Sequence, residues 1–373
     1  MKIGIVKTSL MENEKRLPIS PEHLGFIDKS IRQHYFFEKD YGLDYNISDK
    51  EILSLGYRVL GRDELISNCD TVVLPKPTLE DVQLMKENAT IWGWTHCVQG
   101  RDIAQIGIDK KLTFLSWENM FSWKNGARDL HIFYKNNELA GYCAVLHTLQ
   151  LLGIDGLYGE RKKVVIFGYG SVSKGAIYAL HGRGFNNINV LTKREYHLID
   201  NKNPDVYFKT YTNNNRNITV TDLETSTNLI DFISDADIIV NGVLQDVNKP
   251  EMFIRNSEID KIKPGCIIVD VSCDLGMGFE FAKPTSFENP MFQVEHLSYY
   301  SVDHTPTYLW KSATREISHS LIPFLGIMAQ GCKEIIKNEI LSKAIDINQG
   351  EIVNKDIINF QNRENNYPYF FKK

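Results

Sequence analysis

Short apolar runs alternate with segments of helical periodicity through the first third of the chain. The apolar runs read "KIGIVKT", "YFFEKD", "YRVLG", "TVVLPKP", "TIWGWTHC" and "LTFLSWEN", and helical patterns separate them at residues 20–33, 49–55, 79–88 and 102–109. Strands that alternate with helices pair in parallel and are covered on both faces, so this part predicts a parallel sheet. Ser20 and Pro21 suit the N-cap and the first turn of the first helix.

The alternation stops after Arg128 and starts again with "KKVVIFGYG". Residues 138–151 predict a long helix between the two series, and the second series continues through "NINVLTK", "ADIIVNGVL" and "GCIIVDVS" to "SYYSVDH". The polar, Asn-rich residues 203–219 are interpreted as an excursion between strands. A long periodic segment from Ser312 is expected to return the chain to the first domain.

The predicted fold is therefore α/β, with two doubly wound, Rossmann-like parallel-sheet domains, a cleft between them, and long helices that link them. Residues 1–137 and 306–373 are expected to form a discontinuous substrate domain that carries the catalytic groups. Residues 138–305 are expected to form a dinucleotide-binding domain. A chain of 373 residues, 43% of them hydrophobic, is long enough for two such cores.

Charge and cysteine content narrow the classes of partner. The net charge is -5 and the cations are scattered, which argues against a nucleic-acid partner and favours small molecules. The six cysteines form no CxxC pair and are interpreted as reduced, mostly packing thiols of a cytosolic protein. No apolar stretch approaches the roughly 20 residues that span a bilayer, so we expect a cytoplasmic protein with no membrane partner.

The segment "VVIFGYGSVSKGA" has the pattern of a dinucleotide-binding turn. Gly168 allows the tight turn after a buried strand, and Gly170 lets a pyrophosphate approach the amide groups of the helix that follows. Ser173 replaces the third glycine of the pattern, while Gly175 and Ala176 keep the helix surface small. The alternative is a glycine-rich turn in a parallel sheet without a ligand.

The end of the next predicted strand indicates which dinucleotide is preferred. "NVLTKRE" offers Thr192, Lys193 and Arg194 where an NAD-binding protein would carry a carboxylate. A hydroxyl and two cations suit the 2′-phosphate of NADPH. Alternatively, both cations belong to a solvated turn, and Glu195 lies close enough to blur the assignment.

Three cationic or titratable residues stand near strand ends of the first domain: Arg16, Lys76 and His96. The carboxyl ends of parallel strands face the ligand crevice, so such groups converge on one site. Each has a plain alternative: a surface charge for Arg16, a lysine that extends to solvent for Lys76, and a packed ring for His96. Their joint placement favours a site.

The chain resembles the family that includes alanine dehydrogenase, the transhydrogenase nucleotide-binding subunit and lysine-forming saccharopine dehydrogenase, and within it the N5-(carboxyethyl)ornithine synthases. The resemblance spans residues 1–314 and rests, in order, on "KIGIVKTSLMENEKRLPISP", "LPKP", "GWTHC", "WENM", "AGYCAVLHTL", "GYGSVSKGA", "VDVSCDLGMGFE" and "VDHTPTYLWKSAT". It does not account for the Asn-rich segment or for the C-terminal extension "GEIVNKDIINFQNRENNYPYFFKK".

The resemblance implies roles for single residues. Arg16 and Lys76 would hold the carboxylate and carbonyl of a 2-oxo acid beside His96 as general acid and base, with Asp274 at the nicotinamide side. Glu118, in "WENM", stands where members that take a second amino acid keep a carboxylate. Alternatively, "WENM" is a strand end and Glu118 a solvated carboxylate. Arg128 and Asp129 are further candidates for binding the second amino acid. Pro77 replaces a glutamate common in alanine dehydrogenases, and "VDHTP" around Asp303 and His304 resembles the saccharopine type. The expected cofactor contacts are Gly168, Gly170, Ser171, Val172, Ser173, Thr192, Lys193, Arg194, Val243 and Asp303.

The leading hypothesis is an NADPH-dependent oxidoreductase acting on CH–NH bonds that condenses pyruvate with the side-chain amino group of ornithine or lysine to give an N-(carboxyethyl)amino acid, an opine. The alternatives are an alanine or saccharopine dehydrogenase-like enzyme that uses NAD(P), and a cofactor-binding regulatory protein without catalysis. We expect no metal and a homo-oligomer.

Overall fold

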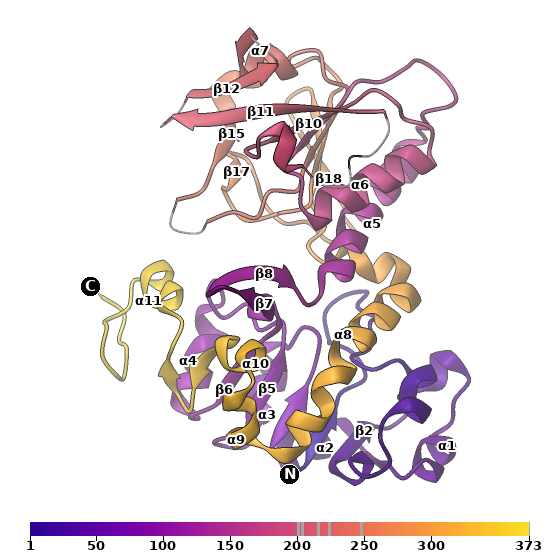
Figure 1. The fold of residues 1–373 in the computed structure, drawn as a ribbon, viewed down its shortest axis with the longest axis vertical. Coiled ribbons are helices and arrows are strands. Elements are labelled where there is room, and N and C mark those ends of the chain that lie inside the picture. The colour runs from indigo at the N-terminus through magenta and orange to yellow at the C-terminus, as the bar shows by residue number, and fades with distance from the viewer. Residues whose placement is uncertain (200–201, 203–204, 215–216, 223–224, 247–248, 373) are drawn as a thin grey trace. The chain divides into compact units, whose positions relative to one another are not determined.

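The computed structural model describes residues 1–199, 202, 205–214, 217–222, 225–246 and 249–372 (Figure 1). The chain divides into two compact units. The first comprises Met1–Tyr134 and Trp310–Lys373, and the second Lys135–Leu309.

An eight-stranded sheet forms the centre of the first unit, in the order β21-β20-β6-β5-β4-β1-β2-β3. The six N-terminal strands are parallel, whereas β20 runs antiparallel to β6. Their bounds are β1 Ile3–Ile5, β2 Tyr35–Glu38, β3 Arg58–Leu60, β4 Thr71–Val73, β5 Thr90–Gly93, β6 Thr113–Ser116, β20 Ile345–Asn348 and β21 Glu351–Ile352.

Helices and a hairpin complete the first unit. The helices are α1 Asp49–Ser54, α2 Arg62–Asn68, α3 Leu79–Leu84, α4 Arg101–Asp109, α8 Trp310–Gln330, α9 Cys332–Lys337, α10 Glu339–Lys343 and α11 Lys355–Gln361. The hairpin is formed by β7 Phe121–Lys124 and β8 Ala127–His131, and 3-10 turns occur at Pro21–Phe26, Arg32–His34, Leu43–Tyr45 and Trp117–Asn119.

Both faces of this sheet are buried, because successive side chains of each strand point to opposite sides. Trp92 of β5 packs in one core with Leu321 of α8. Its neighbour Ile91 packs in a second core with Leu65 of α2 and Val82 of α3. This two-sided burial explains why the strands are short apolar runs.

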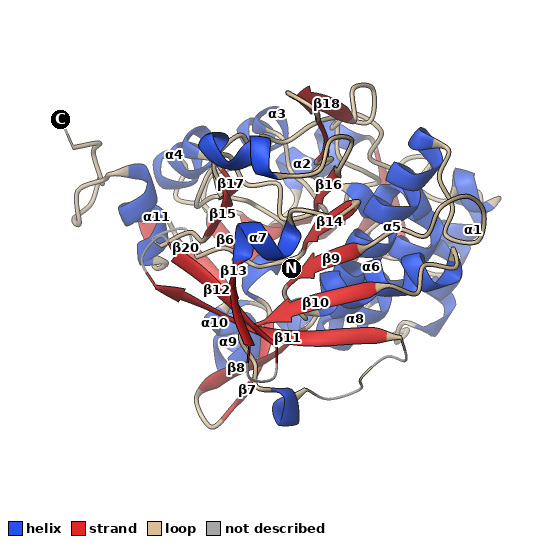
Figure 2. Ribbon diagram, turned by 90° about the horizontal axis from the view of Figure 1, so that it is seen from above, coloured by secondary structure: helices blue, strands red, loops and turns tan. Residues whose placement is uncertain are grey.

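The second unit has a nine-stranded sheet in the order β13-β12-β11-β10-β9-β14-β16-β19-β18. In this order the neighbouring strands β11, β10, β9, β14, β16 and β19 are all parallel (Figure 2). Strands β12 and β13 at one edge and β18 at the other are joined by antiparallel pairing. The bounds are β9 Val164–Phe167, β10 Ile188–Thr192, β11 Val206–Asn214, β12 Asn217–Asp222, β13 Thr225–Asn228, β14 Ile238–Asn241, β16 Ile267–Asp270, β18 Met291–Val294 and β19 Leu297–Tyr300.

The helices of this part are α5 Tyr134–Leu152, which crosses the boundary between the units, α6 Ser171–Gly182 and α7 Leu229–Ile233. A small sheet is formed by β15 Met252–Ile254 and β17 Gly278–Phe279, and 3-10 turns lie at Tyr196–Leu198, Asn256–Lys261 and Thr305–Leu309.

Two glycines set the approach of α5 to α6. A Cβ on Gly141 would lie 1.9 Å from the carbonyl oxygen of Val172, and one on Gly175 would lie 1.8 Å from that of Glu138. Only glycine allows this contact between backbones.

The parallel-sheet α/β class predicted from periodicity is confirmed, and three local expectations need correction. The first predicted helix, residues 20–33, is two short 3-10 turns, because Ile27 is extended and Ser20 makes no side-chain capping bond. The Asn-rich segment 203–219 contains all of β11 and the start of β12; its residues 203, 204, 215 and 216 lie outside the described residues. The hairpin β7–β8 was not predicted.

Strand formation in the Asn-rich segment has a physical reason. Thr, Tyr, Val and Phe favour extended backbone, and Tyr211, Ile218 and Val220 reach the core of the second unit. Thr212 and Thr219, which pair with each other and are more accessible, alternate with these core residues. Among the described residues, no helix is long and apolar enough to cross a membrane.

Candidate functional site

The polar residues of the first unit gather at one edge of its sheet. Lys76 follows β4, His96 follows β5 and Glu118 follows β6, and these three strands are adjacent and parallel. Arg16 lies in the long connection after β1 and not at the strand end as expected. The carboxyl ends of adjacent parallel strands share an edge, which is where open α/β sheets bind ligands.

Arg16 is held by a buried carboxylate. Its Nε donates to Glu14 Oε1 at 2.8 Å, and its guanidinium carbon lies 5.0 Å from the centre of the Trp94 ring. Arg16 and Glu14 are only 2% and 5% exposed. A planar cation fixed on two sides is pre-organised for a carboxylate or carbonyl ligand.

His96 has a strained backbone and an exposed ring. Its φ is +46°, in the left-handed region that costs a non-glycine residue roughly 1 to 2 kcal/mol. Its amide donates to Glu118 Oε1 at 2.7 Å, and its ring Nδ1 lies 3.5 Å from the same oxygen. Half of the side chain, 49%, is accessible. Strain of this kind persists only where the surroundings hold it, as at many functional sites.

Glu118 has two different oxygens. Oε1 accepts the His96 amide, whereas Oε2 is inaccessible to solvent and has no hydrogen-bond partner among the residues that the structure describes. Burial raises the pKa of Glu118 to about 8; hydrogen bonds from backbone amides and the Lys76 cation oppose the rise, and the Asp346 carboxylate adds to it. A cation or a proton that binds at the enclosed oxygen therefore stabilises the buried Glu118 carboxyl group.

The hairpin β7–β8 covers the Glu118 segment. Arg128 Nη2 donates to Asn119 Oδ1 at 3.1 Å. His131 Nδ1 accepts the Phe133 amide at 3.2 Å, so its Nε2, which lies 3.2 Å from the carbonyl oxygen of Glu118, carries the proton. Burial lowers the pKa of His131 to about 4, and the neutral ring is a fixed donor.

In the second unit the glycine turn lies between β9 and α6. Gly168 has a φ of +85°, and a Cβ there would lie 3.1 Å from Val243 Cγ2, so the turn sits directly against the loop after β14. Gly170 is the N-cap of α6 and provides no capping side chain for its first amides, which include those of Ser171 and Val172. Ser173 is fully buried and donates to the Phe167 carbonyl at 3.4 Å, so it takes the packing position of the third glycine.

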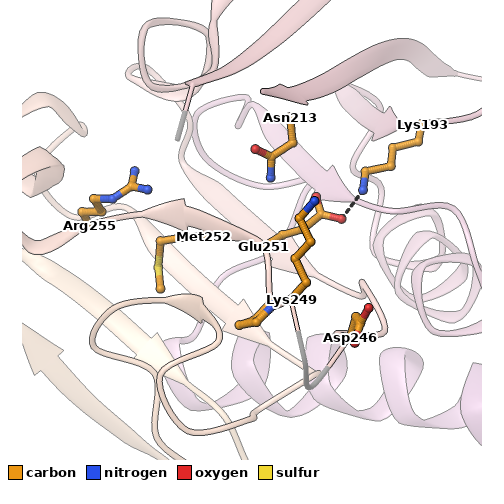
Figure 3. Close-up of a pocket in the computed structure, with 8 residues that line it drawn as sticks. Lys193, Asn213, Asp246, Lys249, Glu251, Met252 and Arg255 are labelled. Carbon is orange, nitrogen blue, oxygen red and sulfur yellow. Dashed lines mark hydrogen bonds and ion pairs between the residues drawn. The ribbon is translucent and has the colours of Figure 1, made fainter. Parts of the chain in front are cut away.

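Lys193, the first residue after β10, lines a cavity of about 500 Å³ (Figure 3). Thr192 is buried and its Oγ1 accepts the Arg194 amide at 3.2 Å, while the Arg194 side chain is exposed. Lys193 forms an ion pair with Glu251, whose Oε2 accepts from the Tyr211 hydroxyl at 3.0 Å. Lys249 and Arg255 also line the cavity.

Two further predicted residues lie elsewhere in the second unit. Asp274 follows β16, and burial raises its pKa. Asp303 Oδ1 lies 2.5 Å from Nδ1 of the buried His304. Near Asp274, the buried Asp270 accepts from Asn241 Nδ2 at 2.9 Å and from the Tyr299 hydroxyl, and burial raises its pKa to about 6.

The structure thus brings His96, Glu118 and Lys76 together, and it joins Arg128 to them through Asn119. It also brings the glycine turn to Val243. Sequence reasoning missed Glu14, Glu251 and Asn119, which bond to Arg16, Lys193 and Arg128. It also missed Asp346, whose carboxylate raises the pKa of Glu118. The available signal was weak, a charged residue between apolar ones such as Asp346 in "AIDIN".

A strand, glycine turn and uncapped helix in one unit, and cationic and titratable groups at the strand ends of the other, define the class of two-unit α/β dehydrogenases. The chain belongs to the alanine dehydrogenase/PNT family: the N-terminal domain model matches residues 4–140 and the C-terminal domain model residues 147–355. The dehydrogenases of this family use nicotinamide cofactors.

Two kinds of relative, carboxyethylornithine synthases and alanine dehydrogenases, match most of the chain. An N(5)-(carboxyethyl)ornithine synthase of Clostridium botulinum is 26% identical over 335 residues, covering 86% of this chain and 92% of its own. Alanine dehydrogenase 1 of Staphylococcus aureus is 23% identical over 371 residues, covering 96% of each. A solved L-alanine dehydrogenase superposes with a TM-score of 0.74 at 20% identity, covering 96% of this chain and 99% of its own. The transhydrogenase of Sinorhizobium meliloti gives 0.70 at 18% identity, covering 95% and 100%.

Proposed function

We propose that this protein condenses a 2-oxo acid, pyruvate, with the side-chain amino group of ornithine or lysine and reduces the product with NADPH to an N-(carboxyethyl)amino acid. Relatives named N(5)-(carboxyethyl)ornithine synthase support this choice within the family. The observation that carries it is Glu118, a carboxylate beside His96 with an enclosed oxygen that accepts no hydrogen bond from a described residue.

An enzyme that takes ammonia needs room for one small amine. A basic amino acid brings a second cation, its α-ammonium group, and a carboxylate of its own. Glu118 suits the ammonium group, because its side chain is 28% accessible and its carboxylate has an oxygen without a donor among the described residues. Arg128, exposed on the hairpin beside Asn119, suits the carboxylate.

The residues of the second unit fit a dinucleotide. Gly168 has the backbone conformation that the tight turn requires, and around Gly170 a Cβ would meet no heavy atom within 4 Å, which leaves space for a pyrophosphate. The first amides of α6 lack a side-chain cap and can bind it, with Ser171, Val172 and Ser173 in the first turn. Thr192, Lys193 and Arg194 would face the adenosine ribose, and Asp274 and Asp303 the remaining part of the cofactor.

Side chains of the first unit would bind the 2-oxo acid, polarise its carbonyl and transfer protons. Arg16, oriented by Glu14, would fix the carboxylate of the 2-oxo acid, and the Lys76 cation would polarise its carbonyl. His96 would take a proton from the attacking amine and return one to the departing hydroxyl. NADPH, when bound, supplies the hydride.

The test measures NADPH oxidation with pyruvate and, in separate reactions, ornithine, lysine or ammonia, followed by the mass of the product. We expect turnover with a basic amino acid and a product in which its side-chain nitrogen carries a carboxyethyl group. Turnover with ammonia alone would contradict the proposal and support an alanine dehydrogenase, which the relatives of that name make the second candidate. No turnover with any amine would support a regulatory protein.

A further inference from the structure

The segment that follows α10 lies against the two loops that carry His96 and Glu118. It forms β20, which pairs antiparallel with β6, the strand that precedes Glu118. It continues through β21 and α11 to residues near the C-terminus. The match to the family model ends at residue 355, the first residue of α11, so the rest of α11 and the residues after it lie beyond the matched part.

Asp346 of β20 is bonded to both loops. Its Oδ2 accepts from the thiol of Cys97, the neighbour of His96, at 3.4 Å. Its Oδ1 accepts from Asn119 Nδ2, beside Glu118, at 2.8 Å and from Asn354 Nδ2 at 2.9 Å. Asp346 is only 4% exposed, and a buried carboxylate is stable there because each of these groups donates to it.

Gln361, at the end of α11, holds the His96 loop from a second point. Its Nε2 donates to the carbonyl oxygens of Cys97 at 2.8 Å and of Val98 at 3.0 Å. Arg363 orients Gln361, since its Nε donates to Gln361 Oε1 at 2.7 Å. Gln361 and Arg363 are completely buried, although they lie within the last residues of the chain.

These bonds explain how the strained backbone of His96 is kept. A left-handed histidine relaxes unless the residues after it are fixed, and the four hydrogen bonds from the C-terminal segment to Cys97, Val98 and Asn119 fix both loops. We propose that Asp346 and Gln361 are positioning residues, through which the C-terminal segment sets the distance between His96 and Glu118. The catalytic part of this inference rests on the proposed function.

The decisive variants are Asp346→Ala and Gln361→Met, with Asp346→Asn as the conservative change. The asparagine oxygen still accepts from Asn119 and Asn354, so Asp346→Asn should retain most of the turnover. Asp81→Ala is the matched control: Asp81 is 2% exposed and is bonded to Arg62 and Thr78 of the same unit.

Two readouts separate positioning from loss of stability. We expect Asp346→Ala and Gln361→Met to lower kcat roughly 10- to 100-fold, as a misplaced catalytic group does, with unchanged NADPH affinity. We also expect faster hydrogen exchange at the amide of His96, which is bonded to Glu118, and at that of Gly100, which donates to the His96 carbonyl at 2.8 Å.

The outcomes are distinguishable. Loss of turnover and faster exchange in both variants, with neither change in Asp81→Ala, would support positioning. Variants that match Asp81→Ala in both readouts would overturn it. If the wild-type protein turns over no amine, the proposed function fails, and the exchange rates of the two loops still decide whether the C-terminal segment holds them.

Discussion

Replacement of Glu118 by glutamine should change how stability depends on pH. Burial raises the pKa of Glu118 to about 8 in the folded protein, from 4.5 for an accessible carboxyl. Between these values the folded state binds a proton that the unfolded state has lost. The free energy of unfolding therefore falls as pH rises from about 4.5 to about 8 and levels off above, and Glu118→Gln removes this part of the slope.

The size of the effect follows from the same values. A rise from 4.5 to about 8 corresponds to at most about 5 kcal/mol. Since 28% of the Glu118 side chain remains accessible, water screens part of the penalty, and we expect about 2 kcal/mol. The amide nitrogen of the variant costs a constant amount at every pH, so it cancels from the slope.

The assay is urea unfolding of wild type and Glu118→Gln at about pH 5, about pH 6.5 and about pH 8.5. The variant should gain about 2 kcal/mol relative to wild type between the lowest and the highest pH. Glu22→Gln, a change at an exposed glutamate, is the control and should run parallel to wild type. A constant difference between Glu118→Gln and wild type over the whole range would refute a raised pKa at Glu118.

Three further predictions concern the proposed reaction and its cofactor. His96→Gln should bind NADPH normally and lose roughly 100- to 10,000-fold in kcat; normal turnover would make the ring structural. Arg194→Ala should weaken NADPH binding roughly 10- to 100-fold in a titration and leave NADH binding unchanged. The control Arg161→Ala, a change at another exposed arginine of the same unit, should change the binding of neither dinucleotide. Equal losses for both dinucleotides in Arg194→Ala would contradict a 2′-phosphate contact. Gly168→Ala should cost roughly 1 to 2 kcal/mol, because its φ is +85° and the new Cβ meets Val243, so an unchanged melting temperature would show that the turn adapts.

Cation placement at the cavity of Figure 3 was only partly accessible to sequence reasoning. The "TKR" segment predicts cations after β10, and the structure places Lys193 there. However, Glu251 neutralises Lys193 from a loop far along the sequence, which leaves the exposed Arg194 as the stronger candidate for a phosphate contact. No pattern near residue 193 contains that information.

Periodicity determined most of the architecture by itself. A short apolar run such as "VVIF" between helical patterns is typical of a strand in a sheet that helices cover on both faces, and the glycines after it are typical of a dinucleotide-binding turn. The sequence also placed Lys76, His96 and Glu118 at strand ends, because adjacent parallel strands bring their carboxyl ends to one edge. These are local rules, and each needs only a short stretch of residues.

Only the tertiary structure decided which groups meet these residues. Asp346 reaches Cys97 across 249 positions, and Gln361 reaches it across 264. Likewise, the polar segment around Tyr211 becomes a strand because β10 offers it an unpaired edge, although its composition suggests a loop. Such contacts depend on how distant segments pack. The free energy of a buried carboxylate is set by the hydrogen-bond donors around it, and that of a strand by the edge it pairs with, and neither is set by the neighbouring residues in sequence.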